Sequence, residues 1–126
     1  TRYARFGWAA ARLDDVLGWL PARVTVLATA AAAPQRAVEV LGTAVRDGRA
    51  HPSPNAGPVE AGFAAVLDVR LGGRTVYASG AEDRAVLGSG RAPVTSDLPR
   101  AVALADRVGV ITLAGALLLR VALRRT

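Results

Sequence analysis

The chain contains no cysteine, no lysine and no methionine, and it has one histidine and only a handful of aromatic residues. Without cysteine it forms neither a disulfide nor a thiolate metal site. Without lysine it has neither a Walker A phosphate-binding loop nor a Schiff-base nucleophile, because both require that side chain. The absence of methionine from a chain that starts at Thr1 predicts a fragment or a processed form.

All sixteen basic residues are arginine, and the formal net charge is +6. These arginines are scattered along the chain with acidic residues between them. A nucleic-acid-binding surface is typically clustered and carries aromatic side chains for base stacking, so we expect no nucleic-acid partner. The hydrophobic content of 52% and the positive mean hydropathy favour a membrane protein or a very apolar helical domain.

Two apolar stretches, residues 13–33 and 101–123, match the ~20 residues that a helix needs to cross a bilayer. Pro21 and Arg23 interrupt the first stretch. A charge inside a membrane usually faces protein or water and marks a function, although Arg23 could also extend from a buried soluble helix to the surface. Arginines flank both stretches, so they do not orient the chain in a membrane.

The expected fold class is therefore all-α, a fragment of an integral membrane helical bundle. Residues 1–126 would form a single domain of a larger multi-pass protein. A long polar loop rich in proline and glycine, residues 34–100, would connect the two candidate spans. The alternative is a soluble helical domain, which purification without detergent would reveal.

Within and around this loop, periodicity predicts further helices. Residues 2–15 resemble an amphipathic helix, and residues 35–48 place apolar side chains on one helical face. Residues 59–71 are expected to be helical up to Gly72-Gly73. A rival interpretation makes 67–71 and 74–78 a hairpin around the glycine pair, and we favour the helix.

The remainder of the chain is expected to be irregular over residues 74–98 and helical over 99–124. Ser96 or Asp97 would cap the last helix, with Pro99 in its first turn.

The most distinctive stretch runs from His51 to Pro58 and packs three prolines and a glycine around polar side chains. This composition favours a rigid turn, and rigidity lowers the entropy lost when polar side chains bind a ligand. Pro58 suits the first turn of a following helix, where Glu60 would lie near the positive end of the helix dipole. The alternative is an ordinary proline-rich surface loop.

Several blocks occur in a family's characteristic order. They are Arg12-Leu13-Asp14-Asp15, Leu20-Pro21-Ala22-Arg23, His51 to Gly57, Glu60-Ala61 and Arg70-Leu71-Gly72-Gly73, with a looser match at Leu87 to Arg91 and at Asp97. Over roughly residues 3–105 the chain resembles the C-terminal part of the adenosylcobinamide-phosphate synthase family of cobalamin biosynthesis, known as CobD or CbiB. In the family a bulky residue and then Pro-Glu usually follow Asn-Ala-Gly, whereas here Pro58 stands one place early.

The resemblance implies a multi-pass protein of the cell membrane, whose N-terminal part lies outside this chain. It also implies a ligase that joins aminopropanol or its phosphate to a propionate carboxylate of adenosylcobyric acid, a corrinoid substrate, through an amide bond. ATP and Mg²⁺ are the expected co-substrate and metal. A membrane-embedded binding or scaffold protein without catalysis is the alternative, and the altered proline position would be its signature.

Joining a carboxylate to an amine requires activation, oxygen ligands for magnesium, donors for phosphate and a base for the amine proton. The candidate metal ligands are Asp14 and Asp15. His51, Glu60 and Asp15 are the candidate catalytic residues. The candidate substrate-binding residues are Arg12, Arg23, Ser53, Asn55, Gly57 and Arg70. Each also has an ordinary structural role open to it: a solubilising acid, an interfacial arginine, a turn residue or a helix-dipole partner.

We expect Arg12, Asp15 and Arg23 to converge with His51, Asn55 and Glu60 around one cleft, because charges beside apolar helices are costly unless they pair or meet a ligand. We also expect this fragment by itself to be inactive and poorly soluble.

Overall fold

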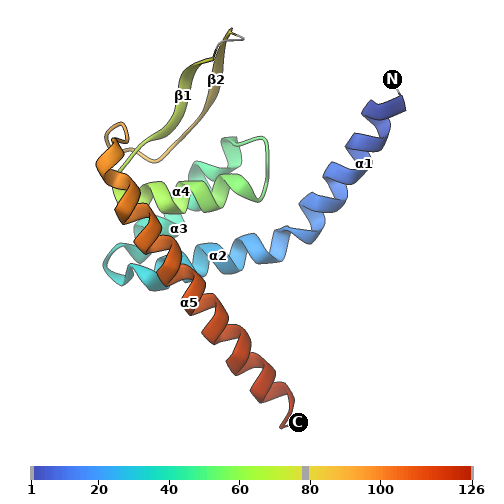
Figure 1. The fold of residues 1–126 in the computed structure, drawn as a ribbon, viewed down its shortest axis with the longest axis vertical. Coiled ribbons are helices and arrows are strands. Elements are labelled where there is room, and N and C mark those ends of the chain that lie inside the picture. Colours follow the sequence, from blue (N-terminus) through green and yellow to red (C-terminus); the bar gives the residue numbers. More distant parts are fainter. Residues whose placement is uncertain (1, 78–79, 126) are drawn as a thin grey trace.

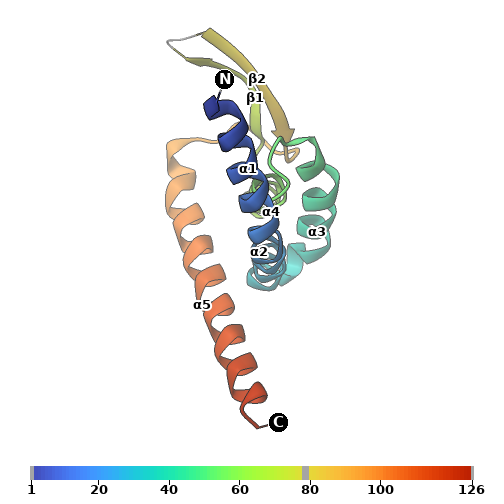
Figure 2. The same cartoon turned by 90° about the vertical axis from the view of Figure 1, so that its right-hand side faces the viewer.

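The computed structural model describes residues 2–77 and 80–125. The elements in order are the helices α1 (Arg2–Leu17), α2 (Trp19–Ala32), α3 (Ala37–Arg46) and α4 (Ala56–Leu67), the strands β1 (Leu71–Tyr77) and β2 (Gly80–Leu87), and the helix α5 (Leu98–Leu123). Helices α2, α3 and α4 pack with the first half of α5 into a small bundle. The start of α1 and the β-hairpin project from one side of it, and the end of α5 projects from the other (Figures 1 and 2).

Helix α4 lies at the centre of the bundle, and small residues allow its neighbours to approach closely. Ala61, Ala64 and Ala65 are buried. The larger core cluster joins four parts of the chain and contains Ala28, Ala64, Leu67, Val69, Leu104 and Val108. Since α4 contacts α2, α3 and α5, the Pro-rich turn before α4 has a fixed place relative to the bundle.

Residues 13–33 do not form the continuous helix that we expected. The helical run is interrupted at Gly18, between α1 and α2. A proline ring clashes with the carbonyl group four residues earlier, and four residues before Pro21 is Leu17, the last residue of α1. Helix α2 has 14 residues and so measures roughly 21 Å, short of the ~30 Å hydrocarbon core of a bilayer.

Helix α5 agrees with the predicted helix over 99–124. The segment Thr95–Leu123 is, among the described residues, the one helix long and apolar enough to cross a membrane. Leu104 and Val108 are its buried residues, whereas Leu113, Leu117 and Leu118 are each more than half exposed. Its second half therefore presents apolar side chains that the described chain leaves uncovered.

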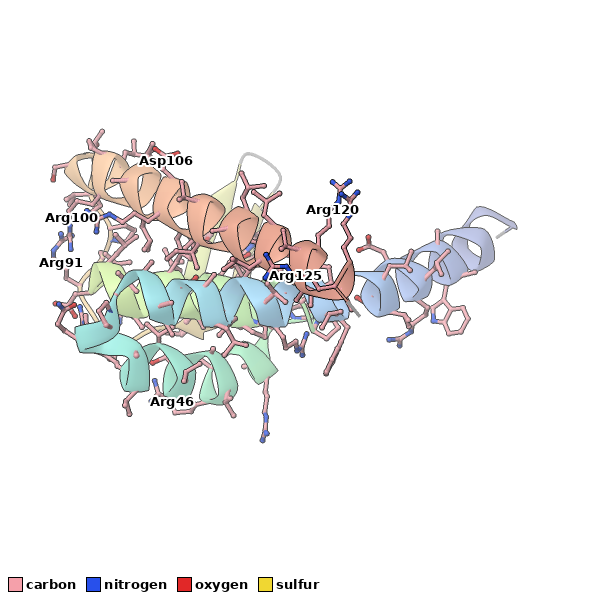
Figure 3. All side chains as sticks on the ribbon, turned by 90° about the horizontal axis from the view of Figure 1, so that it is seen from below. Arg46, Arg91, Arg100, Asp106, Arg120 and Arg125 are labelled. Atoms are coloured by element: carbon pink, nitrogen blue, oxygen red, sulfur yellow. The ribbon has the colours of Figure 1, made fainter. Side chains whose placement is uncertain are left out.

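Ion pairs hold the beginning of α5. Arg91 donates to both carboxylate oxygens of buried Asp97, at 2.7 and 2.8 Å, and Arg100 donates to the same carboxylate at 3.0 Å. Figure 3 shows Arg91 and Arg100 together at this end of α5, and Arg120 and Arg125 at the opposite end. One end of α5 is thus attached to the bundle, while the other carries arginines beyond it.

Most of the chain is helical, as predicted, but the fold also contains a hairpin, and the prediction of an irregular segment at 74–98 is wrong. Strands β1 and β2 pair antiparallel, with Tyr77 opposite Gly80. The rival hairpin around Gly72-Gly73 is also wrong, because both glycines lie within β1. Residues 34–100 are likewise no loop, since they contain α3, α4 and the hairpin.

The glycine pair creates an irregularity inside the strand instead of a turn. The strand register shifts between Leu71 and Gly73, and Gly72 adopts a positive φ of 78°. A Cβ atom at Gly72 would collide with the carbonyl oxygen of Ala85, so glycine is required there. Helix α4 ends earlier than predicted, at Leu67, where Asp68 adopts the left-handed conformation that terminates helices.

Candidate functional site

The Pro-rich turn is organised by Ser53. Its hydroxyl oxygen accepts the backbone N–H groups of Asn55 and Ala56, at 3.3 and 3.2 Å, directly before α4 begins. This is the local capping behaviour typical of serine. Of the two roles open to Ser53, the geometry demonstrates the turn role. Pro58 lies in the first turn of α4, as predicted.

His51 bonds to the same turn. Its Nδ1 lies 3.1 Å from the backbone nitrogen of Ser53 and accepts that N–H. In this arrangement the neutral ring carries its proton on Nε2. Nδ1 also lies 3.3 Å from the Ser53 carbonyl oxygen, which can accept a proton from the doubly protonated ring. The turn therefore holds the ring in place in either charge state.

Asn55 connects this turn to the break between α1 and α2. Its Nδ2 donates to the backbone oxygen of Asp15 at 2.9 Å, and its Oδ1 accepts from Arg23 Nη1 at 3.0 Å. Gly18 makes room for the amide, because a Cβ atom there would lie 2.6 Å from Asn55 Nδ2. The interruption of the helix is thus the place where Asn55 attaches the turn.

Arg23 is held by several contacts at once. Besides Asn55, its Nη1 donates to the carbonyl oxygen of Pro54 at 3.1 Å and lies 3.4 Å from that of Trp19. Its guanidinium carbon lies 4.7 Å from the centre of the Trp19 ring, within the range of a cation–π interaction. The orientation of the Arg23 side chain is consequently fixed before any ligand binds.

Two glycines bring the segment after α3 against the start of α4. A Cβ atom at Gly48 would lie 2.7 Å from the nitrogen of Pro58, and one at Gly57 would collide with the Gly48 oxygen and with His51 Cβ. This contact places Arg49, which lies in the 3₁₀ turn Gly48–Ala50, beside the Pro-rich turn. Gly57 is therefore a packing residue, whatever else it contacts.

A cleft of about 380 Å³ lies between these segments, and we call it the arginine cleft. It is lined by Arg12 of α1, Arg23 of α2 and Arg49 of the 3₁₀ turn, together with Gly48, His51, Pro52, Pro54 and Pro58. Arg12 also lies 3.6 Å from Asp15 and 5.7 Å from the centre of the Trp8 ring. No carboxylate lines this cleft within the described residues, so its charge is positive.

A second cleft of about 440 Å³ shares His51 and Pro52 with the arginine cleft, and we call it the acidic cleft. Its charged lining consists of Glu60 of α4 and Glu82, Asp83 and Arg84 of β2. Arg84 pairs with Glu82 at 3.2 Å. Glu60 thus shares a cleft with His51, as predicted, but it is not among the residues that line the arginine cleft.

The hairpin wall of the acidic cleft is attached to α3 by Asp47. One carboxylate oxygen accepts the backbone N–H of Gly88 at 2.9 Å, and the other pairs with Arg46 at 2.6 Å. Figure 3 shows Arg46 on the outer side of α3. The hydrogen bond from Arg46, and then that from Gly88, lower the pKa of Asp47 from its ordinary value despite partial burial.

The predicted residues therefore converge in part. Arg12, Arg23 and His51 line one cleft, with Asn55 holding Arg23 in place. Asp14 is exposed, and its backbone oxygen accepts the N–H of Gly18. Arg70 is exposed and lines neither cleft; its backbone N–H bonds to Arg91.

The described residues contain no group of three or more histidine, aspartate or glutamate side chains placed to hold a metal ion. Asp14 and Asp15 are successive helical residues and diverge by about 100°, and Asp15 already faces Arg12. Their role as magnesium ligands therefore stays a prediction.

Sequence reasoning overlooked Gly18, Gly48 and Arg49. The helix predicted over residues 35–48 included Gly48, whereas α3 in fact ends at Arg46. The local signal for Arg49 was weak, because it is one of many scattered arginines. Its position only two residues before the single histidine was the available clue.

Comparison with known proteins identifies the family to which this chain is similar. The model of the CobD/Cbib protein family matches residues 1–105. Cobalamin biosynthesis protein CobD of Mycobacterium tuberculosis (strain ATCC 25618 / H37Rv) is 51% identical over 106 residues, which cover 82% of this chain and 34% of that protein. The Rhodobacter capsulatus protein of the same name is 46% identical over 107 residues, covering 84% of this chain and 34% of its own length.

A more distant relative gives the same picture. Cobalamin biosynthesis protein CobD of Halalkalibacterium halodurans is 38% identical over 111 residues, covering 84% of this chain and 35% of that protein. No solved structure matches the chain. The chain spans about a third of the length of the curated relatives it matches. Because the family match covers most of its residues, the chain belongs to the CobD/Cbib protein family.

Proposed function

We propose that this chain is the C-terminal part of a cobalamin-biosynthesis enzyme that joins aminopropanol, or its phosphate, to adenosylcobyric acid through an amide bond. The relatives are named cobalamin biosynthesis proteins, which supports the pathway. The observation that carries the proposal is the pair of oppositely charged clefts that share His51 in their lining. A ligation of this type brings anionic groups together with an amine.

The balance of the reaction determines what the residues have to do. The carboxylate is activated by phosphorylation from ATP. The amine nitrogen then bonds to the carbonyl carbon while the bond to the phosphate oxygen breaks, and the amine loses a proton. We propose that Arg12 and Arg23 hold anionic groups, because guanidinium donors match phosphate and carboxylate geometry. Arg70 would contact substrate only from outside the two clefts.

We assign the removal of the amine proton to a residue of the acidic cleft. Glu60 is exposed in that cleft and, as a carboxylate, can accept the proton. His51, whose Nδ1 accepts the Ser53 N–H, is better suited to donate from Nε2 than to accept there. Asp15 would act through its ion pair with Arg12, and Asn55 and Ser53 position the turn.

ATP and Mg²⁺ remain proposals for this chain. Magnesium, when bound, would neutralise phosphate charge during activation. Since the described residues provide no set of three ligands, we assign no step to the ion. Asp14 and Asp15 would contribute at most one or two carboxylates, as is common where substrate phosphates complete the coordination.

We further propose that α5 crosses the cell membrane and that the intact protein is multi-pass. The exposed apolar residues of its second half and the arginines that follow support this. The intact protein should stay with membranes after an alkaline wash and require detergent for extraction. Recovery of the protein in the soluble fraction would contradict the proposal.

Replacing Arg23 tests the catalytic assignment. In the intact, detergent-purified protein, Arg23→Ala should lower amide formation from adenosylcobyric acid and aminopropanol phosphate about a hundredfold, because a misplaced substrate reacts far more slowly. The product is measured by chromatography. Arg74→Ala, an exposed arginine that lines neither cleft, is the matched control. Unchanged turnover in Arg23→Ala, or no amide product from the unmodified protein, would refute the proposal.

A further inference from the structure

We propose that the arginine cleft is a phosphate-binding site and that Arg49 is its third guanidinium donor. The identity of the phosphate-bearing ligand rests on the function proposed above, but the anion site itself follows from the charges and contacts of this cleft. Arg49 was not suggested by the sequence, and none of the blocks that resemble the family contains it.

The first argument is the charge balance of the cleft. Arg12, Arg23 and Arg49 come from three different segments, and none of the lining residues is acidic. One of these charges is partly compensated by Asp15, which pairs with Arg12 at 3.6 Å. Like charges that share a cleft repel one another unless an anion binds among them. A phosphate group would therefore relieve an electrostatic cost that the folded chain carries.

The second argument is the hydrogen-bonding capacity of Arg23. Its hydrogen bonds to Trp19, Pro54 and Asn55 are all made by Nη1. A guanidinium has five N–H donors, and those on Nε and Nη2 make no hydrogen bond within the described chain. Arg23 is therefore held by one nitrogen and can offer donors from the other two to an oxyanion.

The third argument is that Arg49 has no competing partner. It is exposed, and within the described residues its side chain forms neither a hydrogen bond nor an ion pair. Its backbone, in contrast, is fixed, because Gly48 is buried against Gly57 and Pro58. A side chain that is free to bind but anchored at its base is suited to close over a ligand.

His51 also lines this cleft and can supply a fourth donor. With Nδ1 occupied by the Ser53 N–H, the ring keeps its proton on Nε2. The neighbouring acidic cleft, with Glu60, Glu82 and Asp83, repels phosphate. A ligand that carries both a phosphate and a cationic group would thus be oriented by the two clefts, with the phosphate on the arginine side.

The test is direct binding to the intact protein in detergent, with inorganic phosphate as the probe and phosphorus NMR as the readout. Arg49→Ala should weaken phosphate binding about tenfold or more, the loss expected for one charge-assisted hydrogen bond. Arg49→Lys should recover part of the affinity, and Arg74→Ala should bind like the unmodified protein. Equal affinity in Arg49→Ala and the unmodified protein would overturn the proposal.

Competition distinguishes the source of the phosphate. Displacement of the probe by ATP but not by aminopropanol phosphate assigns the cleft to the nucleotide, and the reverse assigns it to the amine substrate. Failure of both to compete would overturn a role in the proposed reaction. A measurement of amide formation separates the two hypotheses. If phosphate binding depends on Arg49 but no amide product forms, only the proposed ligase activity is refuted. If amide product forms but phosphate binding does not depend on Arg49, only the proposed phosphate site is refuted.

Discussion

The two clefts that meet at His51 have walls of different rigidity. The arginine cleft is lined by α1, α2 and the turns around α4, and Asn55 joins these segments by hydrogen bonds between residues 40 and 32 positions apart. One wall of the acidic cleft is a two-stranded hairpin that is mostly exposed and packs at its base through Leu87. Isolated hairpins are marginally stable, so the acidic wall depends on that base.

This comparison teaches that the charges of the arginine cleft are held by helices and the turns between them, whereas two carboxylates of the acidic cleft, Glu82 and Asp83, are held by a hairpin attached to the bundle. The first cleft is preformed, whereas the second keeps its shape only while the hairpin keeps its position. Substitutions can therefore affect both clefts, the arginine cleft alone or the acidic cleft alone.

The largest effect is expected at the contact that supports both clefts. Gly57→Ala would place a methyl group against the Gly48 oxygen and His51 Cβ, and such overpacking typically costs about 1–3 kcal/mol. Thermal unfolding of the intact protein should begin at lower temperature, and both phosphate binding and amide formation should fall.

Gly42→Ala is the control for this change. Gly42 lies within α3, and a Cβ atom added there would have no neighbouring atom within 4 Å, so alanine should stabilise the helix by roughly 0.5–1 kcal/mol. Equal stability of Gly57→Ala and Gly42→Ala would show that the backbones of Gly48 and Gly57 are not in contact.

A smaller effect, confined to the arginine cleft, is expected for Asn55→Ala. This change removes the bonds to the Asp15 oxygen and to Arg23, at a cost of about 1–3 kcal/mol because partly buried groups lose their partners. Released from Asn55, Arg23 should move relative to the Trp19 ring, which it now faces at 4.7 Å.

Fluorescence of Trp19, measured in a Trp8→Phe background, would report that movement. Phosphate binding should weaken while the acidic cleft keeps its shape. Gln35→Ala, at an exposed position beside α3, should leave both the fluorescence and the binding unchanged. An unaltered Trp19 spectrum in Asn55→Ala would argue against the coupling of this turn to Arg23.

The smallest effect concerns the acidic cleft and depends on pH. The folded-state pKa of Asp47 is lowered, first by Arg46 and also by the Gly88 N–H. The stability that ionised Asp47 adds to the folded state is therefore complete above the ordinary aspartate pKa of about 4. It is lost as the pH falls through the lowered pKa of the folded state. Asp47→Asn should abolish this pH dependence and weaken the attachment of the hairpin to the bundle by about 1 kcal/mol.

Amide hydrogen exchange at Gly88 measures this attachment. At each pH, exchange in Asp47→Asn should be faster than in the unmodified protein, and the difference should shrink towards strongly acidic pH. Phosphate binding by the arginine cleft should not change. A difference that persists or grows on acidification would mean that Asp47 does not hold the hairpin through its ionised form.

Much of the local structure could be predicted from the sequence because its causes lie within a few residues. Pro99 and the residues before it indicated the start of α5, and apolar periodicity indicated α3. The prolines around Ser53 predicted the rigid turn, and Pro58 was correctly placed in the first turn of α4. The ordered blocks from Arg12 to Gly73 indicated the family, which the comparisons confirm.

The hairpin was missed for a physical reason. Gly72-Gly73 is a strong turn signal, yet the pairing of Leu71 with Leu87 and the burial of Leu87 outweigh it. Strand formation depends on such cross-strand contacts more than on intrinsic preference. Likewise, Pro21 suggested a bend, but the hydrogen bonds at the break between α1 and α2 are made by Asn55, which lies far along the chain.

The sequence by itself determined where the Pro-rich turn is rigid, where most of the helical segments lie and which family the chain belongs to, because proline chemistry, periodicity and ordered blocks are local properties. Only the tertiary structure decided that Arg49 joins Arg12 and Arg23 in one cleft, and that Glu60 lines a different cleft with His51. Those placements arise from two backbones touching at Gly48 and Gly57 and from the carboxylate of Asp47, directly after α3, which accepts the N–H of Gly88, directly after β2. Contacts of this kind depend on the packing of distant segments, which no local pattern of residues encodes.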